Sequence, residues 1–183
     1  MELNPELDRR ALRAAYARHR KVQVSDFLQK QAAEHLLKTL TQSRDWRLHV
    51  NQEKGDKIFE LLPEVLASLG RERLEQFNKS VYAQARWGFQ FCFEAIRAQP
   101  GNSDADPLRQ FLELMSSEPT LELVRFITGS DQIDFADAQA TAYGPGHFLT
   151  AHNDSNPGQR RIAAYVLNLT PTWRLAWGGM LQF

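Results

Sequence analysis

The apolar residues change their spacing near Gly129, and this change limits the folds that the chain can adopt. Before Gly129 most apolar residues recur every three or four positions, which is typical of amphipathic helices. After Gly129, short apolar or alternating segments are separated by Gly, Pro and Asn, which is typical of strands and turns. Helices followed by short strands predict an α+β domain, in which the helices pack on one face of an antiparallel sheet or barrel.

Two helices are expected in the first 45 residues. Apolar residues at helical spacing predict the first helix over residues 6–18. Residues 22–24 favour a short strand, and Ser25 is a candidate N-cap because its hydroxyl can accept a backbone hydrogen bond. A second helix is therefore expected to begin just after Ser25 and to continue to about Leu40.

The middle of the chain is predicted to contain one strand and two helices. Apolar and polar residues alternate over residues 46–50, which is the period of a half-buried strand. From residue 56 to residue 98 the spacing is helical, with a break near Gly70. Cys92 falls within the apolar stripe of the second helix, so a buried structural thiol is expected there.

The elements expected after residue 98 are short. Residues 100–107 have the composition of an exposed loop. Two helices are predicted at 107–115 and 119–128, and Gly129 ends the second one. Strands are predicted in the apolar segments that follow, at Ile133 and Phe135, 138–143, 148–151 and 162–169.

Composition excludes several classes of protein. Lys plus Arg and Asp plus Glu both number 22, so a zero net charge gives no global attraction to nucleic acid or anionic membranes. Cys92 is the single cysteine, which rules out an intramolecular disulfide and a metal site built on paired thiolates. The acidic start of the chain does not resemble a signal peptide, and no apolar run approaches the ~20 residues that span a bilayer. We expect a soluble, cytoplasmic protein.

His152 and Asp154 are the candidate metal ligands and catalytic residues. Residues i and i+2 of an extended strand point to the same face, so the imidazole and the carboxylate can bind one ion. The pair would supply two ligands of a two-His, one-carboxylate site, which leaves three positions on Fe(II) for co-substrate and dioxygen. The spacing alone also fits a surface His and Asp at the end of a strand.

The residues around this pair form an ordered pattern. Tyr143-Gly-Pro-Gly precedes the pair, and Arg160-Arg161, the apolar segment 162–169 and Trp177-Gly-Gly follow it. In this order the sequence resembles the 2-oxoglutarate and iron(II)-dependent oxygenases, and especially their prolyl-hydroxylase-like branch. The resemblance covers residues 138–183 well.

The resemblance implies a double-stranded β-helix, or jelly-roll, that is buttressed by N-terminal helices. Residues 1–183 would form a single oxygenase domain, with a helical part at about 1–130 and a β-barrel part at about 131–183. In the family, a second His ligand and an Arg that binds 2-oxoglutarate lie farther along the chain than the Gly-Gly strand. We therefore expect an incomplete barrel, in a chain truncated at Phe183, and no activity from the 183 residues alone.

The resemblance also implies which residues contact the cofactors. His152 and Asp154 would bind the iron, and the hydroxyl of Tyr143 would lie beside 2-oxoglutarate. A core aromatic ring with a solvated hydroxyl is the alternative role for Tyr143. Leu167 falls near the position at which many relatives have a second tyrosine beside 2-oxoglutarate, so it offers packing and no hydrogen bond. Tyr165 and Asn168 are the neighbouring polar alternatives.

Three nearby basic residues need a separate interpretation. Arg160 and Arg161 begin the apolar segment, where paired arginines are more often solvated or ion-paired than bound to substrate. His147 lies five residues before His152 and would face the opposite side of a continuous strand. We do not expect His147 to be a metal ligand.

The implied activity is that of a dioxygenase that hydroxylates a protein or peptide substrate at a prolyl residue. It would use Fe(II), 2-oxoglutarate and dioxygen, and ascorbate is a candidate addition. A catalytically inactive barrel that binds a peptide as a scaffold is one alternative, supported by the missing third ligand and by Leu167. A nucleic-acid demethylase of the same superfamily is the other, but the sequence has no evident basic and aromatic stripe.

Overall fold

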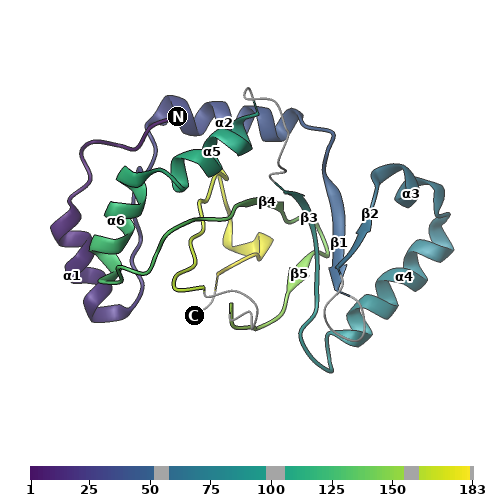
Figure 1. The fold of residues 1–183 in the computed structure, drawn as a ribbon. Helices are drawn as coiled ribbons and strands as arrows, with labels where there is room; N and C mark the ends of the chain where they lie inside the picture. Colours follow the sequence, from purple (N-terminus) through teal and green to yellow (C-terminus); the bar gives the residue numbers. More distant parts are fainter. Residues whose placement is uncertain (52–57, 98–105, 155–160, 182–183) are drawn as a thin grey trace. The chain divides into compact units, whose positions relative to one another are not determined.

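The chain forms a mixture of helices and antiparallel strands in a computed structural model that describes residues 1–51, 58–97, 106–154 and 161–181 (Figure 1). The elements are α1 (Arg9–His19), α2 (Lys30–Gln42), β1 (Arg47–Asn51), β2 (Ile58–Leu61), α3 (Pro63–Ser68), α4 (Arg71–Gln84), β3 (Phe91–Arg97), α5 (Pro107–Met115), α6 (Glu118–Thr128), β4 (Gln139–Ala142), β5 (Phe148–Leu149) and the 3-10 helix η1 (Leu175–Trp177). This mixture confirms the α+β class.

The chain divides into two compact units, and each is built from three separate segments. Unit 1 contains Met1–Gln42, Ala98–Ala138 and Asp154–Leu169. Unit 2 contains Ser43–Arg97, Gln139–Asn153 and Thr170–Phe183. Unit 1 therefore holds helices α1, α2, α5 and α6, whereas unit 2 holds all five described strands together with α3 and α4.

The helices of unit 1 begin and end at residues with clear capping roles. The carboxylate of Asp8 accepts hydrogen bonds from the backbone N–H groups of Arg10 and Ala11, both at 3.0 Å, and so caps α1. Asp106 caps α5 in the same way. Gly129 ends α6 with a φ of 71°, a left-handed conformation that costs glycine little. The predicted helices at 107–115 and 119–128 are thereby confirmed.

The core of unit 1 lies between α2, α5 and an irregular segment. Its buried residues are Leu28, Leu36, Phe111 and Met115. Leu167 and Leu169 pack against this core from a segment that has no regular secondary structure in the described residues 161–169. The expectation of a strand at 162–169 is therefore wrong. The period of two reflects an extended chain that places alternate side chains on a core without pairing its backbone.

The beginning of this irregular segment is fixed by polar contacts. Arg161 forms an ion pair with Asp137 at 3.2 Å, which agrees with the ion-paired role expected for it. The hydroxyl of Tyr165 donates a hydrogen bond to the backbone oxygen of Asp137 at 2.8 Å. Arg160 lies outside the described residues.

Unit 2 is organised around an antiparallel sheet with the order β2-β1-β3-β4, and β5 also pairs with β3. The register places His49 opposite Phe93 and Val50 opposite Cys92. Because side chains alternate between the two faces of a strand, this register assigns Val50 and Cys92 to one face and His49 and Phe93 to the other.

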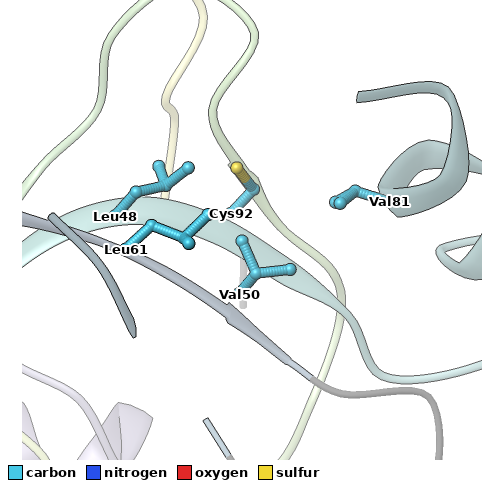
Figure 2. Close-up of a cluster of buried hydrophobic side chains, with 5 residues drawn as sticks. All are labelled: Leu48, Val50, Leu61, Val81 and Cys92. Carbon is cyan, nitrogen blue, oxygen red and sulfur yellow. The ribbon is translucent and has the colours of Figure 1, made fainter. Parts of the chain in front are cut away.

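The first face of the sheet is covered by helix α4. Leu48, Val50, Leu61 and Cys92 form a buried cluster with Val81 of α4 (Figure 2). Cys92 is 6% exposed, which confirms the prediction of a buried thiol, and burial raises the pKa of that thiol.

Three expectations about local structure in the first 98 residues are wrong. Residues 56–98 were expected to be two helices, but the described part also contains strands β2 and β3, and α3 and α4 are separated at Leu69 and Gly70. The backbone of β3 pairs with β1 on one side and with β4 and β5 on the other, so tertiary partners outweigh the local pattern. Within residues 1–51, no strand forms at 22–24, and α2 begins at Lys30 instead of after Ser25.

Among the described residues, none of the helices combines the length and the apolar character that a bilayer crossing requires.

Candidate functional site

His152 follows strand β5 in unit 2, and its imidazole contacts Thr150 and Phe89. The Nδ1 atom lies 3.0 Å from the backbone oxygen of Thr150. A carbonyl oxygen can only accept a hydrogen bond, so this contact requires a proton on Nδ1. The ring also packs on Phe89, with the ring centroids 5.3 Å apart. With Nδ1 protonated, a neutral His152 carries its lone pair on Nε2, the nitrogen that would coordinate a metal.

Thr150 is paired with Gln90, the residue that precedes β3. The backbone N–H of Thr150 donates to the oxygen of Gln90 at 3.0 Å. The Thr150 hydroxyl accepts from the N–H of Gln90 at 2.9 Å and lies 3.1 Å from its backbone oxygen, to which it donates. These contacts extend the pairing between β3 and β5 by one residue, up to the point where the chain turns toward His152.

A row of aromatic rings runs along the face of the sheet opposite α4. We call Phe89, Phe91, Phe93 and Tyr143 the aromatic row. The centroids of Phe89 and Phe91 are 5.6 Å apart, those of Phe91 and Phe93 are 5.1 Å apart, and those of Phe93 and Tyr143 are 5.5 Å apart. Phe91 and Phe93 are buried, whereas Phe89 is 49% exposed. The row connects Tyr143 to His152 through ring contacts at spacings typical of aromatic pairs.

The two ionisable rings at the Tyr143 end of the row are neutral near pH 7. Partial burial raises the pKa of the Tyr143 hydroxyl, so the hydroxyl keeps its proton and can donate a hydrogen bond to a carboxylate. Burial also lowers the pKa of His49, although the carboxylate of Glu60 opposes this effect. His49 is 2% exposed and stacks on Phe93.

Sequence reasoning missed Phe89, Gln90, Thr150 and His49 as parts of this site. The alternation of Phe89, Phe91 and Phe93 has the period of a strand, and it could have indicated that these rings share a face. Nothing in the sequence pattern indicated that Thr150 would pair with Gln90, because the two residues are 60 positions apart.

The predicted site residues are divided between the two units. Tyr143 and His152 belong to unit 2. Asp154 and Leu167 belong to unit 1, where Leu167 packs against the core around Phe111. The side chain of Leu167 can supply packing there and no hydrogen bond.

The donor atoms of His152 and Asp154 suit Fe(II), because imidazole nitrogen and carboxylate oxygen are the ligand types of a two-His, one-carboxylate site. Within the ranges that the structure describes, no group of three or more His, Cys, Asp and Glu residues could hold a metal ion. The described residues therefore offer two ligands by chemical type and no complete metal centre.

His147 stabilises the turn that follows β4. Its Nδ1 accepts a hydrogen bond from the N–H of Gly144 at 3.0 Å, so this nitrogen is used within the turn. In the same turn, the hydroxyl of Tyr82 donates to the backbone oxygen of Gly146. These contacts favour a structural role for His147.

Comparison with known proteins gives one match. No curated protein sequence and no solved structure matches the chain. Residues 138–183 match the family described as the 2OG-Fe(II) oxygenase superfamily, whose members use Fe(II), 2-oxoglutarate and dioxygen. The matched segment contains Tyr143, His152, Asp154 and Leu167, and the match supports a relationship to this oxygenase superfamily.

Proposed function

We propose that the protein is an Fe(II)- and 2-oxoglutarate-dependent dioxygenase of the prolyl-hydroxylase-like type, and that it hydroxylates a prolyl residue of a protein or peptide. The observation that carries the proposal is the superfamily match over the segment containing the His152 and Asp154 pair. The choice of prolyl substrate rests on the ordered pattern from Tyr143 to Trp177-Gly-Gly. Zero net charge gives no reason to prefer a polyanionic substrate.

Each candidate residue has a role in this proposal. His152, through Nε2, and Asp154 would hold the iron, and the protonated hydroxyl of Tyr143 would donate a hydrogen bond to 2-oxoglutarate. Leu167 would contribute apolar packing. When bound, iron and 2-oxoglutarate supply the means to insert one atom of dioxygen into a C–H bond, with succinate and carbon dioxide as the other products. The chain's own residues bind and orient the reactants.

The proposal includes a jelly-roll core and a cytoplasmic location. The small antiparallel sheet of unit 2 is compatible with an oxygenase fold. The single buried cysteine is compatible with a reducing compartment.

Succinate formation tests the proposed chemistry. The full-length protein is incubated with Fe(II), 2-oxoglutarate, ascorbate and cell proteins, and peptides are searched by mass spectrometry for the addition of one oxygen atom to proline. His152→Ala and Asp154→Ala should each remove succinate formation, because each removes a ligand. His19→Ala, at an exposed histidine of α1, is the matched control and should retain it.

The role of Tyr143 is tested separately. Tyr143→Phe keeps the ring that contacts Phe93 and removes the hydroxyl. Loss of a hydrogen bond to a charged group typically costs about 1.5–3 kcal/mol, which corresponds to at least a roughly tenfold rise in the KM for 2-oxoglutarate. An unchanged KM would leave Tyr143 with the alternative role of a core aromatic residue.

The remaining outcomes discriminate between the alternatives. Turnover with methylated nucleic acid and none with protein would reject the prolyl substrate and favour the nucleic-acid demethylase. Absence of both metal binding and succinate formation in the full-length protein would favour the peptide-binding scaffold.

A further inference from the structure

Two contacts from unit 2 bear on the imidazole of His152. The carbonyl oxygen of Thr150 accepts from Nδ1 at 3.0 Å, and Phe89 contacts the ring at a centroid distance of 5.3 Å. The hydrogen bond involves one nitrogen of the ring, whereas the contact with Phe89 involves the whole ring. The hydrogen bond to Thr150 favours a proton on Nδ1, and the contact with Phe89 limits rotation of the ring.

The position of Thr150 is in turn fixed by Gln90. Three hydrogen bonds of 2.9–3.1 Å join the two residues, and two of them use the Thr150 hydroxyl. Gln90 is only 2% exposed, and its own amide accepts from the N–H of Phe91 at 2.8 Å and donates to Gln84 at 2.7 Å. A continuous series of hydrogen bonds therefore runs from the end of α4, through Gln90 and Thr150, to the ring of His152.

We propose that Thr150, held against Gln90 by its hydroxyl, is a positioning residue that fixes the tautomer and orientation of His152 for metal binding. This inference rests on the proposed function, because it takes His152 to be a metal ligand. Thr150 itself touches neither metal nor substrate. It acts through the carbonyl group that it presents to Nδ1.

The physical reason is that a histidine ligand binds metal through one nitrogen only when the other nitrogen carries the proton. A hydrogen-bond acceptor on the second nitrogen selects this tautomer and limits rotation of the ring. Loss of such a partner typically weakens metal binding by about 10- to 100-fold. Without its hydroxyl, residue 150 would leave the buried N–H of Gln90 without its present acceptor, and the turn leading to His152 would loosen.

The test compares Thr150→Val, which removes the hydroxyl and keeps the branched shape, with Thr150→Ser, which keeps the hydroxyl. Thr141→Val makes the same chemical change on β4 of the same sheet and serves as the matched control. Nitrogen NMR of ¹⁵N-histidine-labelled, metal-free protein at a pH where the imidazole is neutral reports the tautomer of His152, whose signals are assigned with His152→Ala. Titration with Co(II), followed by its visible absorption, reports the metal affinity.

The wild-type protein should show the Nδ1–H tautomer of His152. Thr150→Val should shift the ring toward the tautomer mixture of free histidine and raise the Kd for Co(II) about tenfold or more, whereas Thr150→Ser and Thr141→Val should not. An unchanged tautomer in Thr150→Val, or an equal change in Thr141→Val, would overturn the proposal. A wild-type protein with the ordered tautomer but no Co(II) binding would instead overturn the proposed function.

Discussion

Tyr165 provides a residue-scale test of how the irregular segment of unit 1 is held. Its hydroxyl donates to the backbone oxygen of Asp137, and its ring lies edge-on to Phe111. Tyr165→Phe keeps the ring contact and removes the hydrogen bond, so the free energy of unfolding should fall by about 1 kcal/mol. Urea denaturation measures this loss, and Tyr16→Phe in α1 is the matched control. A loss no larger than that of the control would contradict the role of this bond.

The same residue predicts a pH dependence. Burial, followed by the charge of Asp137, raises the pKa of Tyr165 from 10.0 to about 12, because both disfavour the charged phenolate in the folded chain. Because the pKa is raised in the folded state, the contribution of the Tyr165 hydroxyl to the free energy of unfolding is complete below pH 10 and is lost as the pH rises toward 12. The stability difference between wild type and Tyr165→Phe should therefore shrink over this range. A difference that stays constant from pH 9 to pH 12 would contradict the assignment.

Cys92 gives a second test at the scale of one residue. The thiol is buried under α4, and its raised pKa lowers the fraction of reactive thiolate. Alkylation by iodoacetamide at pH 8 should be slower in the folded chain than in urea, because burial both shields the thiol and lowers the fraction of thiolate. Intact mass measured over time follows the reaction. Equal rates in the two conditions would show that the thiol is accessible.

At the scale of elements, the turn between β4 and β5 depends on Gly146. This residue has a φ of 84°, and a Cβ atom there would lie 2.8 Å from the hydroxyl oxygen of Tyr82. Moving Tyr82 away would disturb its ring contact with Phe148 at 5.2 Å and its hydrogen bond to the Gly146 oxygen. Gly146→Ala should destabilise the fold by about 1–3 kcal/mol, as expected for a non-glycine residue in a strained conformation.

Gly144→Ala is the matched control for this prediction. A Cβ atom at Gly144 meets the His147 ring at 3.6 Å, an ordinary contact, and the residue does not have a positive φ. Its effect on the midpoint of urea unfolding should stay within about 0.5 kcal/mol. Similar losses for the two variants would mean that the conformation of Gly146 is not the cause.

At the scale of the whole molecule, the chain passes between the two units five times along the sequence. Segments of each unit therefore connect elements of the other. For example, the 41 residues from Ala98 to Ala138 belong to unit 1 and connect β3 to β4 of unit 2. If one unit were unfolded, the other could form only by closing these residues as a flexible loop, which costs loop-closure entropy. We expect the two units to unfold together although each has its own core.

Leu36→Ala tests this cooperativity. Leu36 is 1% exposed in the core of unit 1, and its truncation should cost about 2–5 kcal/mol. Hydrogen exchange should then accelerate in β3 of unit 2 as well as in α2. Leu175→Ala, at a residue that is 68% exposed, should leave both unchanged. Full protection of β3 in Leu36→Ala would show that the units unfold independently.

The sequence by itself determined the elements whose signals are local. Gly129 ends α6, Asp106 and Pro107 begin α5, and alternation marks β1. In each case the decisive residues lie within one or two turns of the element. The pattern around His152 and Asp154 also indicated a resemblance to the oxygenases, and residues 138–183 match the model of that superfamily.

The tertiary structure decided the elements that depend on distant partners. Residues 91–97 became a strand because β1 and β4 supply partners on both sides, whereas residues 162–169 pack their leucines on a helical core without pairing. The contact that fixes the His152 tautomer depends on Thr150, which pairs with a residue 60 positions earlier. A periodic sequence pattern states which side chains are to be buried, and only the folded chain determines whether a helix, a strand or an irregular segment buries them.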